Sequence, residues 1–211
     1  MNANEILDEM EEIFPDAKCE LYHESPFQLI VAVVLSAQTT DAMVNKVTPA
    51  LFMAYPTAEK MAEATVSELE PYIKKIGLYR NKARSISNLS KDLVERYHGQ
   101  VPYTYKDLMS LAGVGRKTAN VVRGEIWGLA DGITVDTHVK RLSNLIGLTK
   151  NDDPIKIEQD LMKIVPRDSW IDFSHYLILQ GRDKCIARRP KCQECEISGY
   201  CTYGKKKLIN S

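Results

Sequence analysis

Long apolar runs, net charge and an export signal are all missing from this sequence of 211 residues. The longest uninterrupted apolar segment, Leu29–Leu35, is far shorter than the roughly 20 residues that a membrane-spanning helix needs. The acidic N-terminus has no basic stretch before an apolar one, which argues against a secretory signal. We therefore expect a cytoplasmic, intracellular protein without membrane association. Its amino-acid composition is that of an ordinary globular protein.

The lack of net charge, with 28 basic and 28 acidic residues, would by itself argue against nucleic-acid binding. The charges are unevenly distributed, however, because residues 1–24 contain eight acidic residues and one basic residue. Residues 182–211 contain eight basic residues and three acidic ones. Solvated ends of opposite sign are common, so the asymmetry alone assigns no partner.

Alternating strands between hairpin turns are also absent, and helical signals take their place. Ser25 and Pro26 are typical of a helix start and predict a helix that ends near Ala37. Asp41 is expected to cap the start of the next helix. Capping residues and apolar periodicity predict further helices over residues 65–77, 80–98, 104–111, 116–127, 136–145, 155–165 and 170–180. The sequence thus predicts an all-α fold.

Four of the five cysteines lie close together near the C-terminus, in the spacing C-x6-C-x2-C-x5-C. These four are Cys185, Cys192, Cys195 and Cys201. Disulfides are disfavoured without an export signal, so the cluster indicates a metal site. Four thiolates without histidine suit either one structural zinc or a [4Fe–4S] cluster, and the single CxxC pair mildly favours the cluster.

A glycine-rich turn, Gly113-Val114-Gly115, joins two of the predicted helices. The glycines allow a sharp turn while Val114 packs between the helices. The next helix, which starts at Arg116, would present free backbone N–H groups that suit a phosphate oxygen. A simple turn between packed helices has the same glycines, but the Arg-Lys-Thr-Ala that follows favours contact with a DNA backbone.

The segment LAGVGRKTANVV (111–122) resembles the helix–hairpin–helix motif of DNA-repair glycosylases, and VDTHV (135–139) resembles their catalytic aspartate loop. LSAQTTD (35–41) and IKKIGLYRNKA (73–83) resemble two further segments of that superfamily, in the same order. With the cysteine spacing, the resemblance extends over residues 25–201 and is strongest to the endonuclease III family. It implies a bifunctional glycosylase and lyase that acts on oxidised pyrimidines in DNA, with a [4Fe–4S] cluster.

The resemblance implies that Lys117 is the catalytic nucleophile. Its amine would attack C1′ of the sugar, form a Schiff base and allow β-elimination of the 3′ phosphate. A lysine at this position distinguishes bifunctional members from monofunctional mismatch glycosylases. Asp136 is the implied carboxylate partner, which would help to deprotonate Lys117 and stabilise positive charge on the sugar. Asp136 is also well placed to cap a helix, and we expect it to do both.

The resemblance further implies that other residues contact double-stranded DNA that contains damaged pyrimidines or abasic sites. Leu78, as an apolar wedge, and Gln38, as a polar filler, would occupy the space that a flipped nucleotide leaves. A buried leucine and a helix-capping glutamine are the alternatives. The predicted DNA contacts are Gly113, Val114, Gly115, Arg116, Lys117, Gln38, Leu78, His138, Arg188, Arg189 and Lys191. Tyr79, Arg80, Lys82 and Arg84 form either a basic face near the lesion or the polar side of an amphipathic helix.

The sequence departs from the family pattern in three places. Ala112 replaces a hairpin proline, Gln180 replaces a histidine, and the interval from Lys117 to Asp136 is one residue longer. We expect a monomer with two helical lobes: a six-helix barrel domain at 20–128, with the helix–hairpin–helix at 104–127, and a discontinuous iron–sulfur domain at 1–19 and 129–211. A non-catalytic DNA-binding module with a redox-sensing cluster is the alternative from another functional class, but it leaves Lys117 and Asp136 without a role.

Overall fold

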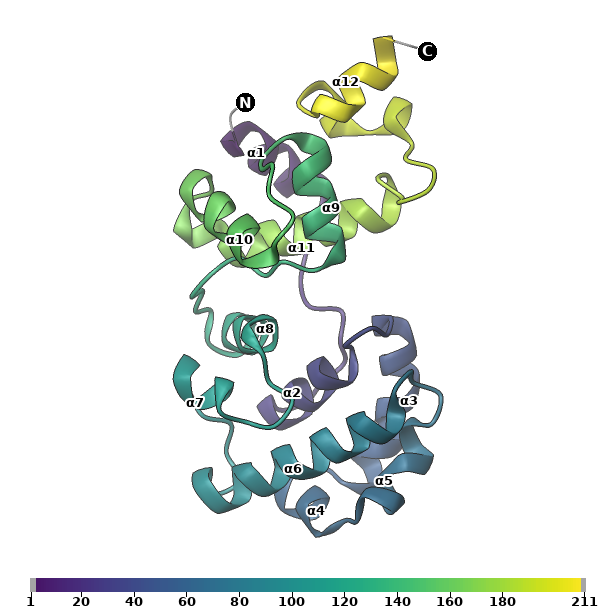
Figure 1. The fold of residues 1–211 in the computed structure, drawn as a ribbon, viewed down its shortest axis with the longest axis vertical. Coiled ribbons are helices and arrows are strands. Elements are labelled where there is room, and N and C mark those ends of the chain that lie inside the picture. The colour runs from purple at the N-terminus through teal and green to yellow at the C-terminus, as the bar shows by residue number, and fades with distance from the viewer. Residues whose placement is uncertain (1–2, 210–211) are drawn as a thin grey trace. The chain divides into compact units, whose positions relative to one another are not determined.

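The computed structural model describes residues 3–209, and every regular element within that range is a helix (Figure 1). The all-α prediction is therefore confirmed. The chain divides into two compact units, one of residues 20–129 and one of residues 1–19 and 130–211. Residues 1–2 and 210–211, at the ends of the predicted discontinuous domain, lie outside the described range. Within that range, no helix is both long and apolar enough to cross a membrane.

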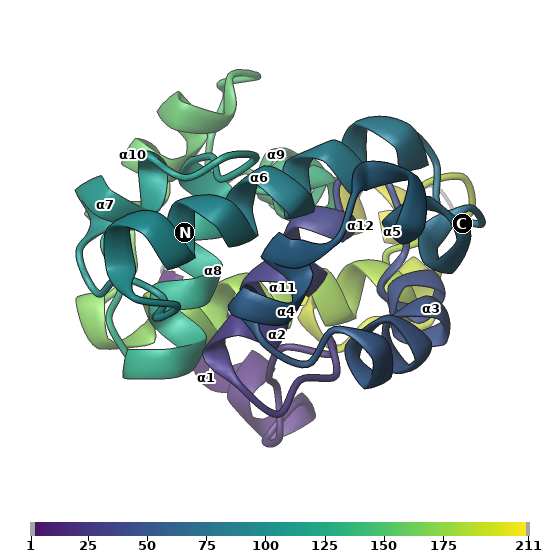
Figure 2. The ribbon, with the colours of Figure 1, turned by 90° about the horizontal axis from the view of Figure 1, so that it is seen from below.

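The unit of residues 20–129 is built around a buried helix, α2 (Pro26–Leu35), in which every residue from Phe27 to Leu35 is buried. The remaining helices of this unit are α3 (Asp41–Ala54), α4 (Ala58–Glu63), α5 (Val66–Ile73), α6 (Tyr79–Tyr97), α7 (Tyr105–Met109) and α8 (Arg116–Trp127). Helix α2 contacts α3, α6 and α8, whereas α6 packs against α4 and α5 (Figure 2). An apolar helix enclosed in this way provides a rigid support for the loops at its ends.

Local capping by side chains explains where several of these helices begin. The Ser25 hydroxyl accepts a hydrogen bond from the Gln28 amide at 3.2 Å, and Thr65 forms a capping box with Glu68, as the sequence predicts. The prediction for α3 is wrong by one residue. Thr40 is its N-cap, because its extended backbone and its hydroxyl, which accepts from the Met43 amide, leave Asp41 as the first helical residue.

The second unit combines both ends of the chain. It contains α1 (Ala3–Ile13), α9 (Thr137–Ile146), α10 (Pro154–Ile164), η1 (Arg167–Ser169), α11 (Trp170–Asp183), η2 (Cys192–Glu194), η3 (Glu196–Gly199) and α12 (Thr202–Ile209). Ile6 and Met10 of α1 share one buried core with Leu142, Phe173 and Ile197. The N-terminal helix is therefore an integral part of the unit that carries the four clustered cysteines.

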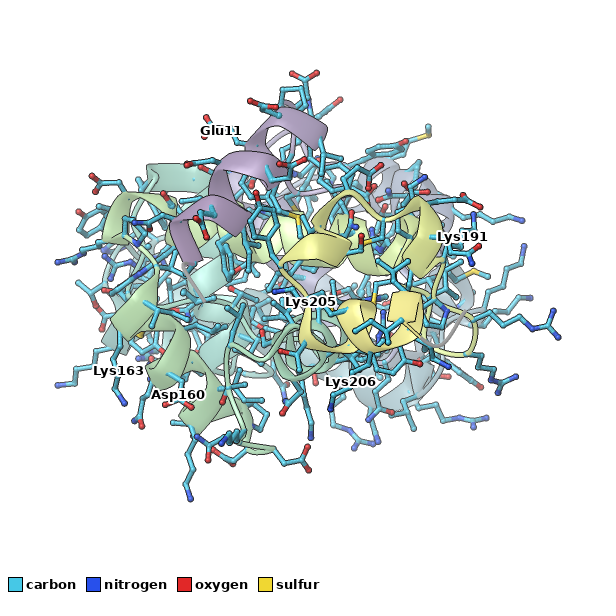
Figure 3. The ribbon with its side chains drawn as sticks, turned by 90° about the horizontal axis from the view of Figure 1, so that it is seen from above. Glu11, Asp160, Lys163, Lys191, Lys205 and Lys206 are labelled. Atoms are coloured by element: carbon cyan, nitrogen blue, oxygen red, sulfur yellow. The ribbon has the colours of Figure 1, made fainter. Side chains whose placement is uncertain are left out.

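The acidic and basic segments of the sequence form separate regions on this second unit. Figure 3 shows Glu11 on α1, whereas Lys191, Lys205 and Lys206 extend from the C-terminal loops and α12. The net charge of zero therefore conceals a local basic surface on the C-terminal elements, and such a surface is able to attract phosphate groups.

Candidate functional site

The glycine turn between α7 and α8 has the geometry that the sequence predicts. Gly113 has a φ of 76°, and a Cβ atom there would lie 3.1 Å from Ser85 Cβ and 3.3 Å from Val34 Cγ1. Val114 is buried. A Cβ at Gly115, in contrast, would meet no atom within 4 Å. The turn is thus tightly packed on its inner side and open at Gly115, where α8 begins.

The first turn of α8 is left without a side-chain cap, because its N-cap residue is Gly115. The backbone N–H groups at such a helix start lack intrahelical partners and form a site for an anion. Arg116 and Lys117 are the first two residues of this helix, and both side chains are exposed. The structure therefore places the predicted nucleophile at an accessible helix N-terminus, next to the candidate phosphate site.

Ala112, which replaces the usual proline of this hairpin, contributes a contact that proline lacks. Its backbone amide donates a hydrogen bond to Asp92 Oδ2 at 3.2 Å, and Asp92 belongs to α6. Proline has no N–H group and is unable to make this bond. The bond therefore offsets part of the loss of the proline φ restraint by anchoring the hairpin to α6.

Gln38 and Leu78 are both exposed and both have a left-handed backbone, with φ values of 54° and 59°. The left-handed conformation costs an L-residue about 1–2 kcal/mol. The third such non-glycine residue within 3–209, His98, is the C-cap of α6, where this conformation is usual. Leu78 is instead at the start of α6 and 60% exposed, so the alternative of a buried leucine is excluded.

Asp136 lies in the other unit, at the start of α9. Its Oδ1 atom accepts a hydrogen bond from the Val139 amide at 2.8 Å, so the predicted N-cap role is observed. The additional residue expected before Asp136 has therefore not displaced it from the helix start. His138 follows on α9 and packs against Gly181, where an added Cβ would lie 2.7 Å from His138 Nδ1. That nitrogen is buried and has no hydrogen-bond partner within the described residues.

The four clustered cysteines surround one cavity. Cys185, Cys192, Cys195 and Cys201 all contribute to its lining. The remaining lining is largely apolar and includes Leu142, Leu145, Ile146, Ile197 and Tyr203. Within residues 3–209, no three histidine, cysteine or carboxylate side chains are grouped as ligands of a single metal ion. A [4Fe–4S] cluster distributes its four thiolates over four iron atoms, and cysteines arranged around a cavity fit that requirement.

Two hydrogen-bond donors point at the cysteine sulfurs. Gln180 Nε2 lies 3.2 Å from Cys195 Sγ, and the Gly204 amide lies 3.3 Å from Cys201 Sγ. Burial raises the pKa of the Cys195 thiol to about 11. Ligation of iron by this sulfur would require loss of the thiol proton, so cluster binding at Cys195 would be coupled to proton release.

Arg141 supports the same loop from α9, a role that sequence reasoning missed. Its Nη2 atom donates to the carbonyl oxygens of Gly181 and Cys185. The loop is closed at its base by the Lys191 amide, which donates to the Lys184 carbonyl at 2.9 Å. Between these anchors, the predicted DNA contacts at positions 188, 189 and 191 are exposed. The structure thus presents three cations on a loop that is fixed at both ends.

The expected basic face on α6 is only partly present. Arg80 and Arg84 are exposed, but Lys82 is buried, with 6% of its surface accessible. Helical position explains this, since Lys82 precedes the buried Ala83 and lies one turn before the buried Ile86. Lys82 is therefore not part of an exposed basic face on α6.

Comparisons with known proteins agree with this arrangement. Residues 31–167 match the HhH-GPD superfamily of base excision DNA repair proteins, and residues 185–201 match the iron–sulfur binding domain of endonuclease III. The chain is 49% identical to endonuclease III of Synechocystis sp., with 94% of this chain and 91% of the relative covered. It is 46% identical to endonuclease III of Bacillus subtilis, with 95% and 92% covered.

A solved structure of a trapped endonuclease III–DNA covalent intermediate matches with a TM-score of 0.92 and 47% identity, over 99% of both chains. The cysteine cavity and the matched iron–sulfur domain, which begins at Cys185 and ends at Cys201, together assign an iron–sulfur cluster to the C-terminal loop. By these similarities, the chain belongs to the endonuclease III family of base-excision DNA repair enzymes.

Proposed function

We propose that this chain removes oxidised pyrimidines from double-stranded DNA through a Schiff base at Lys117 and then nicks the strand by β-elimination. As a member of the endonuclease III family, the chain is a DNA glycosylase with abasic-site lyase activity. The observation that carries the proposal is the exposed lysine at the uncapped start of α8, directly after the Gly-Val-Gly turn. The chain that carries this amine is closely similar to an endonuclease III that was trapped covalently on DNA.

The helix–hairpin–helix holds the DNA backbone in this proposal. A phosphate oxygen would accept hydrogen bonds from the amides around Gly115, where the surface is open. Contacts of this kind position the DNA without reading its sequence. The amine of Lys117 then attacks C1′ as the damaged base departs, which leaves a Schiff base and makes elimination of the 3′ phosphate possible.

Asp136 is the proposed carboxylate partner of Lys117 in this reaction. In its ionised form it would accept a proton from the amine and stabilise positive charge on the sugar. Its hydrogen bond to the Val139 amide fixes the carboxylate at the start of α9, where the helix dipole favours a negative charge. One side chain thus serves as both helix cap and catalytic group.

Gln38 and Leu78 are proposed to enter the duplex when the damaged nucleotide rotates out. Displacing a nucleotide costs unstacking energy, and side chains that fill the gap offset part of it. Both residues are exposed and are held in a costly backbone conformation, as is common for residues with a role in binding. Leu78 is 60% exposed, so burial in the core does not account for its left-handed backbone.

Replacing Leu78 by glycine is expected to make the protein more stable and less active. Glycine adopts the left-handed conformation without strain, so the free energy of unfolding should rise by about 0.5–1 kcal/mol after allowing for glycine entropy. Leu78→Ala keeps the strain and serves as the matched control. Denaturant unfolding and single-turnover excision would measure both effects. A Leu78→Gly variant with normal excision from duplex DNA would contradict the wedge role.

The unit that contains both chain ends is proposed to act as an iron–sulfur domain that adds phosphate contacts. Its four cysteines would bind the [4Fe–4S] cluster, which holds the loop of residues 184–191 in place. Arg188, Arg189 and Lys191 would then meet the DNA backbone, and because such contacts release counterions, affinity should fall with added salt. His138 is proposed to contribute a DNA contact from α9.

The hydrogen bond from Gln180 to Cys195 Sγ is expected to set the electronic properties of the cluster. Hydrogen bonds to cluster sulfurs stabilise the reduced form, so Gln180→Leu should shift the reduction potential to a more negative value. Anaerobically purified wild type and variant should each contain about four iron and four sulfide. Gln193→Leu, at an exposed position of η2 between Cys192 and Cys195, is the control. One zinc without iron would contradict the cluster assignment, and an unchanged potential would contradict the role of Gln180.

The substrate class is tested by excision from short duplexes. We expect single-turnover base release and strand nicking on a duplex with thymine glycol, and no release from a G·T mismatch. We also propose that the active species is a monomer, which sedimentation analysis of the protein on such a duplex would test. Base release from the mismatch without nicking would instead support a monofunctional mismatch glycosylase.

A further inference from the structure

Lys82 connects the two strained loops that carry Gln38 and Leu78. It lies on α6, one turn after Leu78, and its backbone amide donates a hydrogen bond to the Leu78 carbonyl at 3.1 Å. Its side chain reaches the other loop, where Nζ donates to Thr39 Oγ1 at 2.7 Å. Lys82 therefore contacts both the Leu78 carbonyl and the side chain of Thr39, the residue next to Gln38.

Thr39 extends this connection across Gln38. Its hydroxyl accepts from Lys82 and donates to the Ala37 carbonyl at 3.5 Å. The Thr39 amide donates to the Ser36 carbonyl at 3.0 Å, which closes the turn. Gln38 thus lies between Ala37 and Thr39, which are joined by the hydrogen bond from the Thr39 hydroxyl. Lys82 fixes the position of that hydroxyl.

Packing alone does not account for a lysine at this position. The Lys82 side chain is buried, and no carboxylate within the described residues lies within ion-pair distance of it. Burial lowers the pKa of Lys82, so its charged form is disfavoured there. An apolar side chain of similar length would avoid this cost, because burying an amine with a single partner is unfavourable. The amine is therefore best explained by its bond to Thr39.

We propose that Lys82 is a positioning residue that couples the Gln38 loop to the Leu78 turn, so that both side chains are presented to the duplex together. The proposal rests on the proposed entry of Gln38 and Leu78 into the duplex. It predicts that the Lys82–Thr39 contact matters when a base pair must be opened, and that it does not matter for the chemistry at Lys117.

The test compares two substrates across matched variants. Thymine glycol in a duplex requires base-pair opening, whereas borohydride trapping on a single-stranded abasic oligonucleotide does not. The variants are Lys82→Met, Thr39→Val, their combination, and Thr39→Ser, which keeps the hydroxyl. Lys91→Met, at an exposed position of the same helix, is the control. Circular dichroism and thermal unfolding establish that each variant is folded.

Single-turnover excision from the duplex should fall about tenfold to a hundredfold in Lys82→Met and in Thr39→Val, while single-stranded trapping stays within about twofold. The double variant should be no slower than the slower single variant, because both remove one contact. Thr39→Ser and Lys91→Met should match the wild type. If Lys82→Met does not fold, the comparison of Thr39→Val with Thr39→Ser decides the question.

Equal losses on both substrates, or normal duplex excision in Lys82→Met and Thr39→Val, would overturn the positioning role and leave the proposed function intact. A wild type that neither excises thymine glycol nor forms an adduct would overturn the proposed function and the positioning role with it. A defect in Thr39→Ser as large as that in Thr39→Val would also contradict the proposal, because serine keeps the hydroxyl that Lys82 contacts.

Discussion

Replacing Lys117 by alanine is expected to abolish the covalent adduct with DNA and to slow base excision by about 10³-fold or more. The variant loses the only amine that we propose to attack C1′, and with it the Schiff base that β-elimination requires. Because Lys117 is exposed in the first turn of α8, alanine there should leave the fold unchanged. Thermal unfolding would check this.

The Lys117→Arg variant distinguishes the contribution of the positive charge to DNA binding from the contribution of the amine as a nucleophile. Arginine keeps the positive charge for phosphate contact but is never a neutral amine in a protein, so DNA affinity should persist while the adduct is lost. Lys91→Ala, at an exposed position of α6, should be as active as the wild type. Normal strand nicking by Lys117→Ala would contradict the assignment of the nucleophile.

Asp136→Asn should reduce single-turnover excision by about 10²–10⁴-fold without reducing stability. Asparagine is as good an N-cap as aspartate, so the hydrogen bond from the Val139 amide should survive the substitution. Only the negative charge is removed. The variant therefore isolates the catalytic role of the carboxylate from its structural role.

Asp153→Asn is the matched control for this substitution. Asp153 caps α10 in the same way, with its side chain accepting from the Lys156 amide at 3.0 Å, and it has no predicted catalytic role. Its variant should retain normal excision and normal stability. If Asp136→Asn also turned over normally, Asp136 would be a helix cap only.

Local sequence rules predicted most of the elements that carry the site. The Ser25 cap, the Thr65–Glu68 capping box and the Gly-Val-Gly turn follow from hydrogen bonding and backbone freedom within a few residues. The fold class followed from the same patterns, whereas the family was implied by the resemblance of four motif segments and the cysteine spacing to those of endonuclease III. The choice of Thr40 over Asp41 as a cap was missed, because both residues are suitable and only the backbone geometry decides.

The contacts that support the site were not predictable from local patterns. Lys82 meets Thr39, Arg141 meets the Cys185 carbonyl, and Asp92 meets Ala112 only after distant segments pack together. The left-handed backbone at Leu78 was also unexpected, since propensity rules reserve that conformation mainly for glycine. Resemblance pointed to Leu78 as a wedge, but the strain that holds it exposed is visible only in the structure.

The most direct test of the central claim is to identify the residue that becomes covalently attached to DNA. Wild-type protein would be incubated with a thymine glycol duplex and borohydride, digested with protease and nuclease, and examined by peptide mass spectrometry. The proposed mechanism predicts one modified residue, Lys117, in the peptide that follows the Gly-Val-Gly turn. Attachment at any other lysine, or base release without attachment, would contradict it.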